Sequence, residues 1–322
     1  MSPAALRQLL SRFPALPFVQ APSLVEPMPR LAAQLGAGAR LFVKRDDAIA
    51  FGFGGNKVRK LAFVAADAAH LDADTLITAG GVQSNHARVT AAAAAKLGMR
   101  AILVANGPAP SQRTANALLD ALLGAEVVYV ASRDLRAPTM DDIARRVRAE
   151  GAHPYVIPIG ASTPLGALGF VLAVAELLEQ MPAPDVIIHS TSSGGTQAGL
   201  VAGCRLLGLR TRVIGISADE TAAVLQQQIA AIVDGIRDRL GVRVNESLIE
   251  VDDRFVGDGY GIPTDASREA IDLAARTEAI FLDPTYTAKA MAGLIAYVRE
   301  KKFEQSQTIL FWHTGGQVAL FA

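Results

Sequence analysis

The chain has 322 residues, of which 51% are hydrophobic and 19% are charged, and its 31 basic residues are balanced by 31 acidic ones. This composition excludes a disordered chain, which would combine few hydrophobic residues with a high net charge. The balanced charge disfavours nucleic acid and anionic membranes as partners, so we expect a small molecule.

The cysteine content and the N-terminal segment point to a reducing compartment. A single cysteine, Cys204, leaves no internal disulfide and no thiolate cluster for a structural metal, so we expect no metal. The opening residues MSPAALRQLLSRFP lack the apolar core of a signal peptide. No apolar run is long enough to span a bilayer. We therefore expect a soluble cytoplasmic protein.

Short apolar strand patterns alternate with helical patterns over most of the chain. The predicted strands are 40–44, 75–80, 101–106, 125–130, 154–159, 185–190, 212–217 and 308–313. The predicted helices are 56–70, 87–97, 112–123, 138–150, 165–180, 196–208, 219–238, 265–278 and 285–302. Many strand runs are apolar on both faces, as in a parallel sheet that helices cover. The expected fold class is therefore open, mostly parallel α/β.

Two stretches rich in glycine, proline and small residues, 48–55 and 160–166, are candidate domain boundaries. They predict a small domain of residues 48–162, inserted into a large domain of residues 1–47 and 163–322.

The stretch FGFGGNKVRK (51–60) places Lys57 in the first turn of a predicted helix. A cation beside the positive end of a helix dipole costs about 0.3–1 kcal/mol. The same position lowers the pKa of an amine, which suits a nucleophile. A solvated surface lysine is the plainer interpretation, and it fits Lys60 better.

A second candidate loop, GGVQSNHA (80–87), places four polar side chains at a helix N-terminus: Gln83, Ser84, Asn85 and His86. Together with the helix dipole, such side chains can hold a carboxylate. Simple capping by Ser84 or Asn85 would explain one of the four. We expect His86 to be structural rather than a catalytic base.

A third loop, Ser-Ser-Gly-Gly-Thr (192–196), joins a predicted strand to a predicted helix. Backbone N–H groups at a helix start, with glycines that allow close approach and hydroxyls that donate, form an anion cup. The loop lacks both the Walker lysine and the GxGxxG pattern, so a phosphate monoester fits better than a nucleotide. A glycine-rich turn with Thr196 as N-cap is the alternative.

Two further segments, 282–291 and 311–321, place Tyr286 and Thr287 at a helix start and Thr314 after the last predicted strand. Taken alone each is weak, because a tyrosine in a first helical turn more often packs than reacts. The lysine and the phosphate cup together carry more weight. Pyridoxal phosphate requires one amine for its aldehyde and one anion site for its phosphate.

In this order, GGNKVRKL, TAGGVQSNHARVTAAAAAKLG, SSGGTQAGL, LDPTYTAKAM and HTGG resemble the pyridoxal-phosphate enzymes grouped as D-cysteine desulfhydrase and 1-aminocyclopropane-1-carboxylate (ACC) deaminase. Residues 41–47 and 154–170 also match, so the resemblance spans nearly the whole chain. It implies the tryptophan-synthase-β-like fold, called fold type II. This fold has two open, twisted, mostly parallel sheets flanked by helices, around the cofactor, and it usually occurs as a homodimer.

The resemblance also implies roles for individual residues. Lys57 is the lysine that forms the Schiff base, in the small domain. The implied catalytic residues are Lys57, Ser84 and Tyr286. The implied cofactor contacts are Asn56, Lys57, Asn85, Ser193, Gly194, Gly195, Thr196, Tyr286, Thr287 and Thr314. The implied substrate contacts are Gln83, Ser84, Asn85 and Thr314.

Two positions favour the desulfhydrase branch. ACC deaminases carry glutamate where this chain has Thr287, and leucine where it has Thr314. A carboxylate near the pyridine nitrogen keeps that nitrogen protonated and makes the ring a deep electron sink, which suits the opening of a cyclopropane. A neutral hydroxyl suffices when the substrate expels a good leaving group.

The implied function is α,β-elimination and deamination of a small β-substituted amino acid. D-cysteine is the first candidate, with pyruvate, sulfide and ammonia as products. A cysteate sulfo-lyase and an ACC deaminase are alternatives. A non-catalytic homologue that only binds pyridoxal phosphate is the alternative from another class.

The chain also departs from the usual pattern of this family. SLVE (23–26) replaces Thr-Pro-Leu-Glu, and GAST (160–163) replaces Gly-Gly-Ser-Asn close to the expected substrate. Phe51 and Phe53 precede the lysine, and Phe53 is expected to crowd the pocket. These departures bear on the identity of the substrate more than on the type of reaction.

Overall fold

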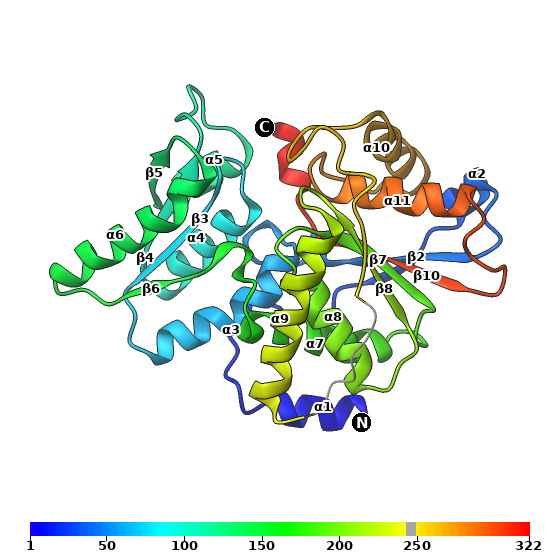
Figure 1. The fold of residues 1–322 in the computed structure, drawn as a ribbon, viewed down its shortest axis with the longest axis horizontal. Coiled ribbons are helices and arrows are strands. Elements are labelled where there is room, and N and C mark those ends of the chain that lie inside the picture. The colour runs from blue at the N-terminus through cyan, green and yellow to red at the C-terminus, as the bar shows by residue number, and fades with distance from the viewer. Residues whose placement is uncertain (243–248) are drawn as a thin grey trace.

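The computed structural model describes residues 1–242 and 249–322, and it contains two mostly parallel sheets (Figure 1). The six-stranded sheet has the order β1-β2-β10-β7-β8-β9, and the four-stranded sheet has the order β5-β4-β3-β6. The strands are β1 (Val25–Pro27), β2 (Arg40–Arg45), β3 (Thr75–Gly81), β4 (Arg100–Asn106), β5 (Glu126–Val130), β6 (Pro154–Val156), β7 (Val186–Thr191), β8 (Arg212–Ser217), β9 (Glu250–Asp252) and β10 (Thr308–His313).

Helices flank both sheets, as the alternating pattern predicted. The α-helices are α1 (Pro3–Leu10), α2 (Pro29–Leu35), α3 (Asn56–His70), α4 (Asn85–Leu97), α5 (Ala115–Leu122), α6 (Arg136–Ala149), α7 (Pro164–Leu178), α8 (Gly195–Leu206), α9 (Ala222–Leu240), α10 (Asp265–Glu278) and α11 (Thr287–Arg299). The short 3₁₀ helices are η1 (Asp46–Ala48), η2 (Phe51–Phe53), η3 (Arg133–Leu135), η4 (Ile159–Ala161) and η5 (Gln317–Phe321). The predicted α/β fold class is confirmed.

The four-stranded sheet is formed by residues 75–156, and the six-stranded sheet by strands that lie before and after this segment. Figure 1 shows the four-stranded sheet on the left and the six-stranded sheet on the right. The predicted domain boundaries at residues 48 and 162 stay predictions. In residues 1–242 and 249–322, no helix combines the length and the apolar character needed to cross a bilayer.

Helices α3, α7 and α8 pack closely beneath the two sheets, and glycines permit this approach. A Cβ on Gly169 of α7 would collide with the carbonyl oxygen of Arg59 in α3. A Cβ on Gly199 of α8 would likewise collide with the carbonyl oxygen of Ala167 in α7. The starts of α3 and α8 are therefore held by close helix packing.

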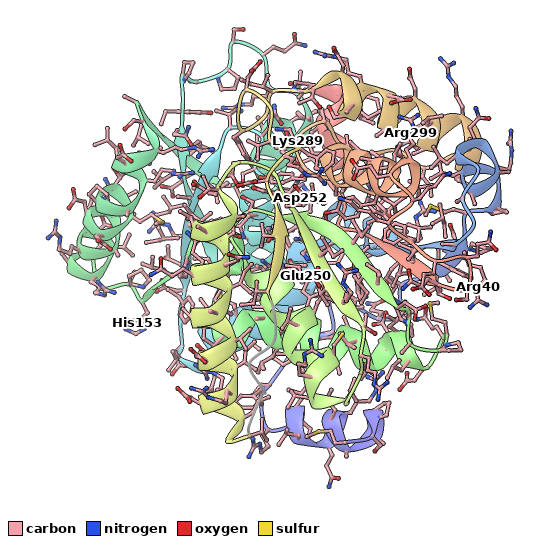
Figure 2. All side chains as sticks on the ribbon, turned by 45° about the vertical axis from the view of Figure 1, so that its right-hand side comes forward. Arg40, His153, Glu250, Asp252, Lys289 and Arg299 are labelled. Atoms are coloured by element: carbon pink, nitrogen blue, oxygen red, sulfur yellow. The ribbon has the colours of Figure 1, made fainter. Side chains whose placement is uncertain are left out.

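Strand β9 ends the six-stranded sheet and carries two acidic residues, Glu250 and Asp252 (Figure 2). Glu250 forms an ion pair with Arg212 of β8, and Asp252 pairs with Arg254. Charged side chains on an edge strand disfavour pairing with another sheet. These ion pairs therefore help to protect the edge from pairing with another sheet.

Candidate active site

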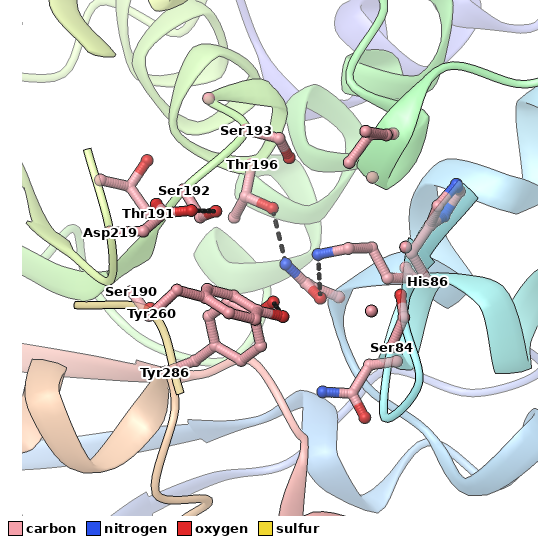
Figure 3. Close-up of a pocket in the computed structure, with 18 of the residues that line it drawn as sticks. Ser84, His86, Ser190, Thr191, Ser192, Ser193, Thr196, Asp219, Tyr260 and Tyr286 are labelled. Atoms are coloured by element: carbon pink, nitrogen blue, oxygen red, sulfur yellow. Dashed lines mark hydrogen bonds between the residues drawn. The ribbon is translucent and has the colours of Figure 1, made fainter. Parts of the chain in front are cut away.

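A cavity of about 290 Å³ lies where the carboxyl ends of strands from both sheets meet (Figure 3). Strands β3, β4 and β7 end at its wall, as do the loops after β8 and β10. Ligands of open α/β sheets bind at such strand ends. The cavity brings together nine of the predicted site residues: Asn56, Lys57, Ser84, Asn85, Ser193, Gly194, Thr196, Tyr286 and Thr314.

Three predicted site residues are not part of the cavity wall. The side chain of Gln83 accepts a hydrogen bond from the backbone N–H of Asn116 at 2.9 Å, on the side of α5. Thr287 is fully buried and donates to Asp283 Oδ1 at 2.6 Å. Gly195 donates its N–H to Ser162 Oγ at 3.2 Å, behind the loop.

The prediction that Phe53 crowds the pocket is wrong. Its side chain is 60% exposed, and it does not line the cavity. Phe51 stacks on Phe18 with 4.0 Å between ring centroids, so it too faces away. Gly52 lies between Phe51 and Phe53 and has a left-handed conformation, with φ of 53°, so the chain turns between the two phenylalanines.

Lys57 is positioned by the two glycines before α3. Gly54 and Gly55 have φ values of 69° and 98°, which favour glycine. A Cβ on Gly55 would lie 3.0 Å from the carbonyl oxygen of Thr314, and Asn56 donates its N–H to that same oxygen at 2.9 Å. The glycines thus bring the start of α3 against the end of β10.

Side-chain hydrogen bonds connect Lys57 to the loop of residues 192–196, which we call the phosphate-cup loop. Lys57 Nζ donates to Asn56 Oδ1 at 3.1 Å, and Asn56 Nδ2 donates to Thr196 Oγ1 at 2.9 Å. Burial lowers the pKa of Lys57 to about 8, the negative charge of Asp283 opposes this shift, and the positive charge of Arg88 adds to it. A fraction of the amine is therefore unprotonated, and nucleophilic, at neutral pH.

The start of α8 has the features of an anion site. Gly194 is its N-cap, with φ of 75°, and has no side chain that could cap the first turn, in which the Gly195 N–H donates to Ser162 Oγ. The hydroxyls of Ser190 and Thr191 line the same cavity and are buried without a hydrogen-bond partner among the described residues. Unpaired buried donors beside a helix N-terminus fit a phosphate group. With the amine of Lys57, they fit pyridoxal phosphate.

The interpretation of Lys60 as a solvated surface lysine is wrong. Its side chain is buried, and its Nζ donates to Ser162 Oγ at 3.2 Å. Ser162 Oγ in turn lies 2.7 Å from Ser193 Oγ of the phosphate-cup loop. Burial and the neighbouring Lys57 hold the pKa of Lys60 well below its usual value. Lys60 follows Lys57 by three residues, which places both side chains on one face of α3. This spacing was the signal in the sequence that could have predicted the burial of Lys60.

Sequence reasoning also missed Tyr260, whose loop has no periodic pattern. Its hydroxyl lies 2.6 Å from that of Tyr286, and the two rings meet edge to face on one side of the cavity (Figure 3). Ser84 and His86 lie on the opposite side. His86 Nε2 is hydrogen-bonded to Thr78 Oγ1 at 2.8 Å, and burial lowers the pKa of its ring well below the usual value.

Acidic and basic groups complete the wall, among them Asp219, Arg133 and Arg136. Over residues 1–242 and 249–322, no three His, Cys, Asp or Glu side chains are grouped so that they could hold a metal ion.

Comparison with known proteins identifies the family. A family model described as pyridoxal-phosphate dependent enzyme matches residues 18–315. A crystal structure of an ACC deaminase homologue is similar at 36% identity, with a TM-score of 0.92 over 98% of this chain and 96% of that chain.

Two more distant structures share the fold. The processed form of threonine deaminase isoform 2 from Solanum lycopersicum is 19% identical, with a TM-score of 0.68 over 97% of this chain and 85% of that chain. A pyridoxal 5'-phosphate-dependent aspartate racemase is 17% identical, with a TM-score of 0.70 over 98% of this chain and 95% of that chain. The family match over most of the chain and the 36% identity together confirm the resemblance: the chain belongs to the pyridoxal-phosphate dependent enzymes, as a fold type II member of the ACC deaminase and D-cysteine desulfhydrase group.

Proposed function

We propose that this enzyme catalyses the α,β-elimination and deamination of a small β-substituted amino acid, with D-cysteine as the first candidate. The products would be pyruvate, sulfide and ammonia. The observation that carries the choice of branch is Thr314, a neutral hydroxyl in the cavity wall where ACC deaminases carry leucine. Thr287 contributes less than the sequence suggested, because it is turned toward Asp283.

The phosphate end of the cofactor would be held by Ser193, Gly194 and Thr196 at the start of α8, and its aldehyde by Lys57. When bound, pyridoxal phosphate supplies an electron sink for the electron pair released at the substrate Cα. Lys57 Nζ would take the proton from Cα, because an amine with a pKa of about 8 is a competent base near neutral pH.

The substrate carboxylate would bind at the start of α4. Ser84 Oγ accepts from Ala87 N–H at 3.2 Å, which leaves its own O–H free to donate. Asn85 Oδ1 accepts from Asn116 Nδ2 at 2.9 Å, which leaves the Nδ2 of Asn85 as a donor. Two donors beside a positive helix end suit a carboxylate.

Tyr286 would contact the cofactor ring and donate a hydrogen bond on the side of the leaving group. Burial raises the pKa of its phenol well above the usual value, and its contact with Tyr260 adds to this. The phenol therefore stays protonated at neutral pH and is available as a hydrogen-bond donor.

A product assay tests this function. The holoenzyme is given D-cysteine, L-cysteine, cysteate and ACC, and sulfide, sulfite, 2-oxo acid and ammonia are measured. We expect equal amounts of sulfide and pyruvate from D-cysteine. Lys57→Ala should lose both the activity and the visible absorbance of the bound cofactor.

Other outcomes would support other functions. Release of 2-oxobutyrate from ACC, with no sulfide from D-cysteine, would support the second candidate, ACC deamination, which the description of the 36%-identical structure favours. A yellow protein that turns over none of these amino acids would indicate a non-catalytic homologue.

We also propose that the enzyme is a homodimer, on the strength of the family resemblance, and that it is cytoplasmic, because its single cysteine fits a reducing compartment. Sedimentation analysis of the holoenzyme tests the dimer, and fractionation of cells tests the compartment.

A further inference from the structure

Arg136, the first residue of α6, lies close to the proposed carboxylate site. Its Nη1 lies 3.5 Å from Asn106 Oδ1. Asn106 ends β4 and is paired in register with Gly81, which ends β3 and begins the loop to Ser84. The guanidinium is therefore one strand away from the group that would hold the substrate carboxylate. All four residues line the active-site cavity.

Among the described residues, Arg136 has no carboxylate within ion-pair distance, unlike its neighbour Arg133. Arg133 lies 3.8 Å from Asp219 Oδ2, and its guanidinium stacks over the ring of Tyr260 at 4.8 Å. Within the part of the chain that the structure describes, Arg136 takes part in no ion pair. Burial lowers the pKa of Arg136, and the positive charge of Arg133 lowers it further, whereas Tyr260, Asp134 and Asp219 oppose this shift. An unpaired, half-buried cation is costly unless a ligand supplies the opposite charge.

The phosphate of the cofactor does not account for this charge. Between Arg133 and the phosphate-cup loop lies Asp219, whose Oδ2 accepts a hydrogen bond from Ser192 Oγ at 3.2 Å. A phosphate approaching the arginines from that side would meet the carboxyl group of Asp219. The α-carboxylate of a simple amino acid would already be bound by Ser84 and Asn85. The remaining candidate for the partner of Arg136 is therefore a second negatively charged group on the substrate.

We propose that Arg136, supported by Arg133 and Asn106, forms a subsite for a negatively charged β-substituent, so that amino acids with a fixed anion on Cβ, such as a sulfonate, are substrates alongside D-cysteine. This inference rests on the proposed elimination and deepens it. The β-substituent and the α-carboxylate are attached to adjacent carbons, so both anions can reach neighbouring donors. D-cysteine remains a substrate because its sulfur also leaves as an anion, but its thiol has no fixed charge.

For a sulfonate the reaction balances without an added oxidant or reductant. The Cα–H bond breaks and the proton passes to Lys57, and the C–S bond breaks as sulfite leaves with the bonding pair. A Cα–Cβ double bond forms. Cβ then takes up one proton and becomes the methyl carbon, and one water molecule replaces the substrate nitrogen, which leaves as ammonia, so that pyruvate is the remaining product.

The test compares charged and neutral β-substituents on the same amino-acid backbone. For the holoenzyme, kcat/KM is measured with cysteate and with β-chloroalanine, each as D and L isomers. Arg136→Gln should lower kcat/KM for cysteate by about tenfold or more, since a charge-assisted hydrogen bond is lost. The value for β-chloroalanine should change little. Arg136→Lys should restore part of the loss, and Arg148→Gln, an exposed arginine on the same helix, is the matched control.

An equal loss of kcat/KM with cysteate and with β-chloroalanine would overturn the inference. Arg136 would then bind the α-carboxylate that both substrates share, or stabilise the fold. Unchanged kinetics with cysteate would also overturn the inference. Dissociation constants of D-cysteate and D-serine, measured by calorimetry, provide a second readout. If nothing is turned over, the proposed elimination fails, but a preference for cysteate that Arg136→Gln removes would still support the subsite. Equal affinities in the unmodified enzyme would refute it.

Discussion

Asn56 donates its side-chain amide to the hydroxyl of Thr196 at 2.9 Å, across 140 positions of the sequence. This bond joins the start of α3, which carries Lys57, to the start of α8, the proposed anion site. The other end of the same amide accepts a hydrogen bond from Lys57 Nζ. One side chain therefore sets the distance between the two groups that pyridoxal phosphate must reach at once.

Asn56→Ala should weaken cofactor binding by about tenfold, because the lysine and the anion site lose their shared partner. The measurement is a titration of apoenzyme with pyridoxal phosphate, followed by visible absorbance. Gln226→Ala, which removes an exposed amide on α9, should leave the affinity unchanged. Equal affinities for Asn56→Ala and the unmodified protein would show that the helix packing alone positions the two groups.

The pH dependence of cofactor capture should reveal the lowered pKa of Lys57. Aldehydes react with the unprotonated amine, so the rate should rise with pH and level off above about pH 8. An ordinary lysine would give a midpoint of about 10.4. Rapid mixing of apoenzyme with pyridoxal phosphate at a series of pH values measures this midpoint.

Arg88→Met provides a further check on the cause of this shift. The positive charge of Arg88 favours the unprotonated form of Lys57, so its removal should move the midpoint to higher pH. Arg145→Met, on the exposed side of α6, is the control. A midpoint that moves to lower pH would contradict the assigned cause.

Arg59 should be a main determinant of stability. It donates to Asp46 Oδ2 at 2.9 Å and to Glu176 Oε2 at 2.8 Å, and all three side chains are buried. Arg59→Ala would leave two buried carboxylates with fewer partners, at a cost of about 3–5 kcal/mol in the free energy of unfolding. Urea unfolding followed by circular dichroism measures the loss.

The matched control for this prediction is a surface pair. Arg299 and Glu269 form an ion pair of 2.6 Å with both side chains about half exposed. Arg299→Ala should cost less than about 1 kcal/mol. Similar losses for the two variants would mean that burial of the Arg59 network adds nothing to its energy.

The sequence predicted the long, periodic elements well and the short ones poorly. Strands such as 75–80 and 212–217 lie within one residue of their observed bounds, because continuous apolar runs mark buried parallel strands. Strands β1 and β9, of three residues each, were missed, and β6 (Pro154–Val156) was predicted too long, as 154–159, since so short a strand shows no clear period. Helix α2 was missed in a segment punctuated by proline and glycine, and helix α1 was missed as well.

At the site, motifs predicted which loops meet but not which way each side chain points. Thr287 and Tyr286 are neighbours at the start of α11, yet only Tyr286 faces the cavity. Lys60 was taken for a surface residue because its burial depends on α7 and on Ser162, which are distant in sequence. Arg136 and Tyr260 belong to no recognisable motif. These contacts join residues that are distant in the sequence, so patterns within a short stretch of sequence cannot predict them.

Lys60 offers the sharpest test of how the anion site is built. Burial and the positive charge of Lys57 hold the pKa of Lys60 well below its usual value. Its partner Ser162 is hydrogen-bonded to Ser193 of the phosphate-cup loop. An anion bound there should raise the pKa of Lys60, since a nearby negative charge favours the ammonium form. Anion binding should therefore be accompanied by proton uptake.

Sulfate is the suitable probe for this prediction, because it has no proton to gain or lose near pH 8 and does not react with Lys57. Calorimetry of sulfate binding to the apoenzyme, in buffers of different ionisation enthalpy, gives the number of protons taken up. Lys60→Met should bind sulfate more weakly and take up fewer protons, whereas Lys96→Met, at the exposed end of α4, should behave like the unmodified protein. Uptake that persists in Lys60→Met would assign the proton to Lys57, and absence of uptake in the unmodified protein would mean that Lys60 is already charged before the anion arrives.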